Sequence, residues 1–237
     1  KHDDDGGVTQ QKQRERAEKQ TRIAAETGDE YLELMAEGMR YAAKEDWRKA
    51  AKAYREAIPL SPFDPTTYFN LGAVLSNSRH VVEAAQRFLE AKERSPVGSE
   101  GWAMATASGF EMLTHKACAE VAKPEWWNDE GLMALSLKVV RAVPSEVATN
   151  IMRAVVLCGW GGDAWQGGRS RSAAELLKAA THYDRAAALC PAPAVKADFI
   201  EQAEECRDAS QAKAHESSLR LLLAMVSETP PKGKKET

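Results

Sequence analysis

The chain has 237 residues, a formal net charge of -3 at pH 7 and a pI near 6.0, so its overall charge gives no attraction to nucleic acid or to an anionic membrane. Hydrophobic residues make up 43% of it and aromatic residues only 7%, an alanine-rich balance that favours close-packed helices over sheets. No apolar run approaches the roughly 20 residues that cross a bilayer as a helix, so we expect no transmembrane segment.

The first residues, KHDDDGG, do not have the pattern of a signal peptide, and the chain begins without Met, so we expect a processed or truncated chain. Residues 8–26 are good helix formers with almost no apolar stripe. Residues 1–30 are therefore predicted to form a charged N-terminal helix and tail, with the helix exposed or frayed.

Two stretches 34 residues apart, AYREAIPLSP at 53–62 and RFLEAKERSP at 87–96, share an aromatic residue, then Glu-Ala, then Ser-Pro. The match extends over a whole unit, whose first copy has Leu34, Gly38, Tyr41, Ala50, Tyr54, Ala57 and Pro62. The second copy has Tyr68, Gly72, Leu75, Ala84, Phe88, Ala91 and Pro96. An internal period of this length indicates a solenoid of stacked units.

Each unit has the pattern of a helical hairpin. Spacings of three and four residues place the first three positions on one face of a first helix and the next three on one face of a second. Gly38 and Ala50 are small, so the two helices can approach closely while the aromatic residues fill the space beside them. KEDW at 44–47 supplies a polar turn, and Pro62 ends the second helix.

On these residues the chain resembles the tetratricopeptide repeat (TPR) family, and only Glu37 departs from the family pattern, which usually has a large aliphatic residue there. The resemblance implies an all-α fold, a right-handed α-solenoid of helical hairpins. It also implies that the first helix of each hairpin lines the concave face. Two well-matched units are expected in residues 31–98.

Residues 99–193 are predicted to hold two degenerate TPR-like units. Ten residues separate Pro62 from Gly72 in the well-matched units, and the same spacing separates Pro144 from Ala154. The second-helix pattern occurs again at Ala179, Tyr183, Ala186 and Pro191. Both units are longer than 34 residues, which implies insertions near 123–131 (KPEWWNDEG) and 159–172 (GWGGDAWQGGRSRS). In the first insertion, Asn128 or Asp129 is expected to cap the start of a helix.

Residues 194–228 are predicted to form a C-terminal capping helix, because a solenoid needs its last apolar face covered. The apolar run LRLLLAMV at 219–226 either packs within this cap or forms a dimer or membrane contact. Residues 229–237 are expected to be a disordered tail.

The sequence holds no motif for catalysis, a metal or a cofactor, and we expect none of the three. The four cysteines lack metal-ligand spacing and suit reduced thiols in an intracellular protein. The cytoplasm is favoured, and an organelle stays open because we expect a processed or truncated N-terminus. GGDAWQGGRS has neither the Lys nor the Ser or Thr of a phosphate-binding loop. His182 is expected to be structural, and RSRS at 169–172 is a weak candidate phosphorylation motif.

The positions one step past the packed residues should face the concave groove. They are Met35, Met39, Phe69, Asn70, Ala73, Asn77 and Phe110. Methionine adapts its shape and asparagine can pair with a peptide backbone, so this groove suits an extended peptide or a partner helix. The alternative is that the methionines and Phe69 only fill the inner bend of a tight superhelix. Trp160 and Trp165 of the second insertion are further candidate contacts.

Chaperone-binding TPR proteins resemble one another in a carboxylate clamp of Lys, Asn and Arg. Here only Asn70 matches, while the other clamp positions hold Met35, Met39, Glu100 and Met104. Binding to a chaperone through such a clamp is therefore not expected, because Glu100 would repel the carboxylate.

The sequence thus predicts a non-enzymatic protein–protein interaction scaffold, whose partner is a protein or peptide rather than a nucleic acid. Two alternatives remain. The chain is a structural subunit of a large complex, or it is a regulatory or targeting segment of a larger polypeptide. A stable monomer at micromolar concentration would count against the structural subunit.

Overall fold

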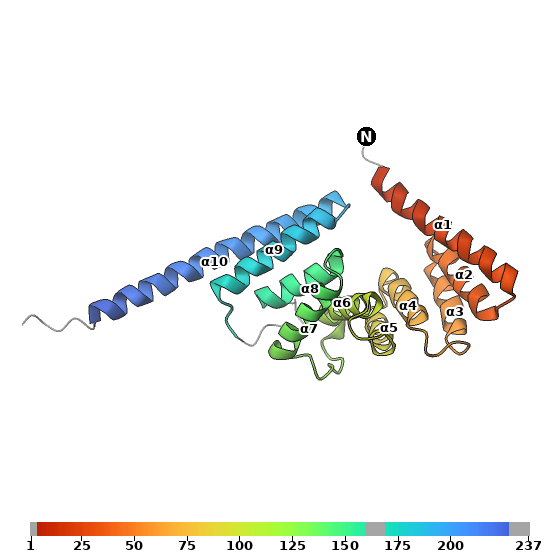
Figure 1. Cartoon of the computed structure of the whole chain (residues 1–237), viewed down its shortest axis with the longest axis horizontal. Coiled ribbons are helices and arrows are strands. Elements are labelled where there is room, and N and C mark those ends of the chain that lie inside the picture. Colours follow the sequence, from red (N-terminus) through yellow and green to blue (C-terminus); the bar gives the residue numbers. More distant parts are fainter. Residues whose placement is uncertain (1–3, 160–168, 228–237) are drawn as a thin grey trace, which may run out of the picture.

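The computed structural model describes residues 4–159 and 169–227, and within them the chain forms α-helices and one short 3-10 turn, with no strand. The helices are α1 (Asp4–Thr27), α2 (Glu30–Ala42), α3 (Trp47–Ala57), α4 (Pro65–Asn77), α5 (Val81–Arg94), α6 (Glu100–Thr114), α7 (Asp129–Ala142), α8 (Val147–Cys158), α9 (Ala173–Leu189) and α10 (Pro193–Ser227). They pair as hairpins α2–α3, α4–α5, α6–α7 and α8–α9, and each hairpin contacts the next. Figure 1 shows the hairpins in one curved row, with α1 at one end and α10 along α9 at the other. The predicted all-α solenoid of helical hairpins is confirmed.

The first two hairpins close around an aromatic ring that lies directly on a glycine. A Cβ added to Gly38 would lie 2.5 Å from Cε1 of Tyr54, and one added to Gly72 would lie 2.9 Å from Cδ1 of Phe88. Both rings are buried, with 2% and 4% of their surface exposed. The glycines therefore set how closely the two helices of each hairpin approach.

Polar side chains cap the N-terminus of most of the first helices of the hairpins. Asp29, Asp64 and Ser99 accept hydrogen bonds from backbone N–H groups in the first turns of α2, α4 and α6. These bonds satisfy donors that have no partner inside the helix. Asn128 does the same for α7, where its Oδ1 accepts from the N–H of Gly131 at 2.9 Å, so the predicted cap in the first insertion is confirmed.

The expectation that the N-terminal helix is exposed or frayed is wrong for the face that meets α2. Ala17 and Ala24, two turns apart on α1, are only 4% and 2% exposed. Ala17 lies beside Ala43, the residue that follows α2, and Ala24 lies beside Ala36 of α2. Because this contact is made by alanines rather than by large apolar residues, it leaves no apolar stripe in the sequence. Helix α1 thus packs as an additional helix at the start of the solenoid.

The first insertion packs against the third hairpin. The Trp127 ring lies 5.4 Å from the Phe110 ring, centroid to centroid, and Lys123 Nζ donates to the carbonyl of Leu113 at 3.3 Å. The predicted interruption of the third unit is therefore a structured loop between α6 and α7 that covers part of their core.

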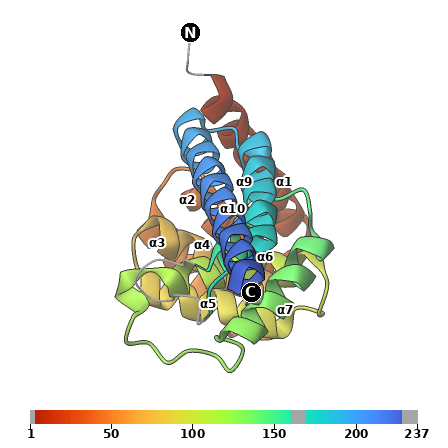
Figure 2. The same ribbon diagram turned by 90° about the vertical axis from the view of Figure 1, so that its left-hand side faces the viewer.

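Helix α10 runs beside α9 and continues beyond it. Figure 2 shows the two helices side by side, and Ser210 Oγ donates to the carbonyl of Ala173 at the first residue of α9 at 2.8 Å. Arg207 forms an ion pair with Asp184 farther along the same contact. Past Ser210 the helix extends away from α9 (Figure 1), and Leu219 there is 47% exposed.

Candidate functional site

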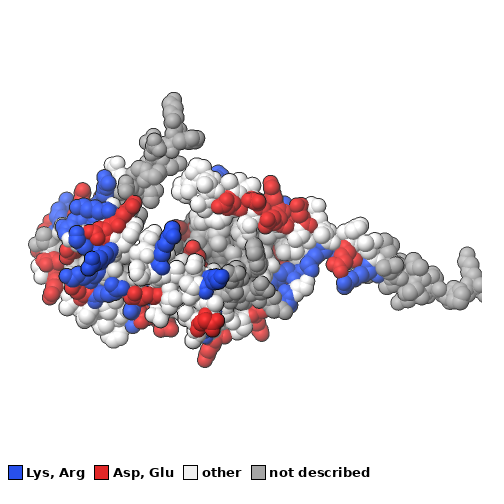
Figure 3. Space-filling model, turned by 180° about the vertical axis from the view of Figure 1, so that it is seen from behind, with Lys and Arg blue, Asp and Glu red and all other residues white. Residues whose placement is uncertain are grey.

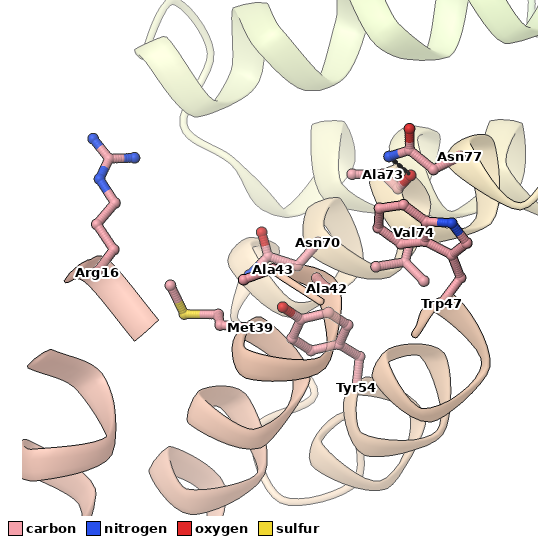
Figure 4. Close-up of a pocket in the computed structure, with 10 residues that line it drawn as sticks. All are labelled: Arg16, Met39, Ala42, Ala43, Trp47, Tyr54, Asn70, Ala73, Val74 and Asn77. Atoms are coloured by element: carbon pink, nitrogen blue, oxygen red, sulfur yellow. Dashed lines mark hydrogen bonds between the residues drawn. The ribbon is translucent and has the colours of Figure 1, made fainter. Parts of the chain in front are cut away.

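A cavity of about 230 Å³ lies where α2, α3 and α4 meet. Its walls are formed by Arg16, Met39, Ala42, Ala43, Trp47, Tyr54, Asn70, Ala73, Val74 and Asn77. Figure 4 shows these side chains around one space, with Arg16 standing apart on α1. The cavity thus joins the first two hairpins to the N-terminal helix.

Four predicted groove residues, Met39, Asn70, Ala73 and Asn77, line this cavity together. They come from α2 and α4, the first helices of successive hairpins. Met39, Asn70 and Ala73 are half-buried, and Asn77 is exposed. These four residues therefore form one wall of the cavity, and their role in binding a partner stays a prediction.

The other three predicted groove residues do not reach the cavity. Met35 is 8% exposed and its sulfur accepts a hydrogen bond from Thr67 Oγ1 at 3.3 Å. The Phe69 ring packs edge-on against Phe88 at 5.4 Å, and Phe110 is 3% exposed. These three side chains pack in the hydrophobic core.

Two polar groups in the cavity make no hydrogen bond to any described residue: the side-chain amide of Asn70 and the hydroxyl of Tyr54. Burial raises the pKa of Tyr54, so its hydroxyl stays protonated and can donate. The Asn77 amide differs, because its Nδ2 already donates to the carbonyl of Ala73 at 2.9 Å. The sequence analysis missed Tyr54 and Trp47 as lining residues, because Tyr54 was assigned to hairpin packing and Trp47 to a turn.

Trp160 and Trp165, the other candidate contacts, lie outside the described residues. The described end of the same insertion is attached to α7 by ion pairs. Arg171, only 5% exposed, forms a two-pronged ion pair with Asp129 at the start of α7, and Arg169 also pairs with Asp129 at 3.2 Å. Ser172 caps α9 and Ser170 accepts a hydrogen bond from Lys213.

Within residues 4–159 and 169–227, no group of three or more His, Cys, Asp or Glu side chains has the arrangement of a metal site. None of the helices in this part of the chain is both long enough and apolar enough to cross a membrane. None of the four cysteines, all of which lie in this part of the chain, forms a disulfide. Lys and Arg side chains gather over the α1–α3 end of the molecule, as Figure 3 shows.

A buried polar cluster in the fourth hairpin contains His182. Its Nδ1 lies 3.0 Å from Oδ1 of Asn150, and the nearly buried Arg153 donates to Ser136 Oγ at 2.9 Å. Burial, together with the charges of Arg153 and Arg185, lowers the pKa of His182 from 6.5 to about 4. His182 is therefore neutral in the folded chain at pH 7, as expected of a structural residue.

This shift predicts a loss of stability in mild acid. Between pH 6.5 and pH 4 the unfolded chain binds a proton at His182 that the folded chain does not, so the free energy of unfolding falls as the pH falls. We expect His182→Gln to remove about 1–2 kcal/mol of the decrease between pH 7 and pH 4.5, a value discounted because part of the ring meets solvent. Urea unfolding at both pH values measures this, with His215→Gln on exposed α10 as the control. An unchanged pH dependence in His182→Gln would contradict the assignment.

Comparison with known families supports the repeat architecture. A family model described as TPR repeat matches residues 38–78. The matched segment runs from the middle of α2 to the end of α4 and so contains most of the cavity wall. A search of curated proteins finds no match.

Proposed function

Because the chain is a tetratricopeptide-repeat protein, we propose that it is a protein–protein interaction scaffold that binds an extended peptide or a partner helix in the α2–α4 cavity. TPR repeats generally mediate binding between proteins, and we propose that this one acts by binding and has no catalytic activity. Four cysteines that form no disulfide support an intracellular site of action.

The observation that carries this proposal is the pair of polar groups without partners beside the apolar residues of the cavity wall. The Asn70 amide and the Tyr54 hydroxyl offer two donors and an acceptor beside Met39 and Ala73. Binding sites commonly combine an apolar lining with a few such polar groups, which fix the orientation of the ligand. An asparagine side chain can pair with both the N–H and the carbonyl of a peptide backbone.

The flexible thioether of Met39 supports a ligand that carries an apolar side chain, because methionine can adjust to its shape. The cavity is small, so it would hold one side chain of the ligand, with the rest of the segment lying along the first helices. Arg16 on one side adds a positive charge that would favour an acidic or carboxyl group nearby.

A selected peptide would test this directly. Peptides are selected from a displayed random library against the whole chain, and the dissociation constant of a labelled peptide is then measured by fluorescence anisotropy. Asn70→Ala removes one or two hydrogen bonds of about 0.5–1.5 kcal/mol each, so we expect binding to weaken about five- to tenfold. Ala73→Arg should abolish binding, because the long side chain fills the cavity.

Lys52→Ala, an exposed change on α3, is the matched control and should leave affinity unchanged. Circular dichroism establishes that each variant keeps its helical content. Selected peptides that bind wild type, Asn70→Ala and Ala73→Arg equally well would place the binding surface elsewhere and contradict the proposal.

A further inference from the structure

A second cavity, of about 660 Å³, lies between α1 and α2. It is lined by Arg14, Ala17, Glu18, Thr21, Arg22, Arg40, Ala43 and Lys44. The two cavities share Ala43, but Arg16 lines only the first, and Arg14 and Ala17 line only the second. Its existence does not depend on the function proposed for the α2–α4 cavity.

The bottom of this second cavity is formed by two small apolar residues, Ala17 and Ala43. At 4% and 7% exposure, their methyl groups are almost covered by the contact between the two helices. Because both residues are small, no large side chain of the chain itself fills the space above them. An open space therefore lies above the helix contact, but little of the two methyl groups is left for a ligand to touch.

The walls of the second cavity carry an excess of positive charge. Four cationic residues face one carboxylate, that of Glu18. Arg14, Arg22 and Lys44 form no ion pair with any described residue. The nearest carboxylate to Arg40, that of Glu37, is 4.0 Å away, and both side chains are close to half exposed. Figure 3 shows Lys and Arg side chains concentrated over this end of the molecule.

We propose that the cavity between α1 and α2 binds an acidic segment of a partner protein. Its carboxylates pair with Arg14, Arg22 and Lys44, above the alanines at the bottom of the cavity. Charge complementarity identifies the partner, because the unpaired cations around one cavity attract carboxylates and repel a basic segment.

The preference for carboxylates is confined to one end of the cavity between α1 and α2. A smaller neighbouring cavity shares Thr21 and Arg40 with this one, but it is lined by Glu33 and Glu37. The carboxylates of the bound segment therefore lie toward the C-terminal end of α2, where Lys44 stands, and not toward Glu33.

Two labelled model peptides test the proposal by fluorescence anisotropy with the whole chain. One has the repeat Glu-Ala-Glu-Leu, and the other has Lys in place of Glu. We expect the acidic peptide to bind, with an affinity that falls as salt is raised, and the basic peptide not to bind. The double variant Arg22→Gln/Lys44→Gln should weaken binding of the acidic peptide about tenfold.

The matched control Arg48→Gln/Lys52→Gln removes the same charge from the exposed face of α3 and should leave binding unchanged. Ala73→Arg, which closes the other cavity, should also leave it unchanged, so the two proposals can fail separately. Equal losses in both double variants would overturn the assignment, because attraction to net charge alone would explain them. Light scattering that shows self-association, abolished by Arg22→Gln/Lys44→Gln, would overturn the separate partner in favour of a second copy of this chain.

Discussion

A Gly38→Ala variant is expected to lower the free energy of unfolding by about 2 kcal/mol, even though alanine is the better helix former by about 1 kcal/mol. The added Cβ would lie 2.5 Å from Cε1 of Tyr54, closer than any stable contact between carbon atoms. The ring has little room to move aside, because Tyr54 is 98% buried between α2, α3 and the neighbouring hairpin. Either the ring or the whole of α3 must shift, and both changes disturb the core of the first unit.

Gly109→Ala is the matched control for this experiment. Gly109 is also a buried glycine within a first helix, but a Cβ there would meet Leu89 Cδ2 at 3.5 Å, an ordinary contact. We expect this variant to be neutral or to gain up to about 1 kcal/mol from helix propensity. Urea unfolding followed by circular dichroism compares the two. Equal stability of the two variants would contradict the role assigned to Gly38.

The pairing of Gly38 with Tyr54 was predictable from the sequence because the same spacing returns at Gly72 and Phe88. A repeated pattern carries information that a single pattern does not, since both copies must satisfy the same packing. The contact of α1 was not predictable in this way. Its packing face consists of Ala17 and Ala24, and alanines in a charged helix give no apolar periodicity.

The sequence was enough to predict which side of each helix faces the groove, but not how deeply each side chain is buried. The register of the repeat gives the face of each helix that turns toward the groove, and this was enough for Met39 and Asn70. How deeply a side chain is covered depends on the next hairpin, which is why Met35 and Phe110 are buried. Tyr54 was missed because a residue that packs against glycine can still turn its hydroxyl toward a cavity.

The ion pair between Arg171 and Asp129 joins residues 42 positions apart and is not part of the repeat. It could therefore not be predicted from the sequence alone. The Arg171 side chain is 3% exposed, and its Nε has no hydrogen-bond partner among the described residues. The Asp129 carboxylate is therefore the main compensation for a buried charge. It also fixes the end of the second insertion against α7.

We expect Asp129→Asn to lower the free energy of unfolding by about 3 kcal/mol, because it leaves Arg171 buried without a counter-charge. Arg171 also holds the pKa of the Asp129 carboxyl below its usual value. The stability that the ion pair contributes is therefore fully present above the unfolded pKa near 4 and is lost as the pH falls further, through the lower pKa of the folded state. Urea unfolding at pH 7 measures the effect of the substitution.

Arg169→Gln is the control, because Arg169 pairs with the same carboxylate but its side chain is half exposed. Its loss should cost much less than the loss of Asp129, because solvent screens an exposed pair. The double variant Asp129→Asn/Arg171→Leu should recover part of the stability that Asp129→Asn loses, since an apolar side chain needs no counter-charge in a buried position. If the double variant is no more stable than Asp129→Asn alone, the cost does not come from an unpaired Arg171, and the insertion must be held by other contacts.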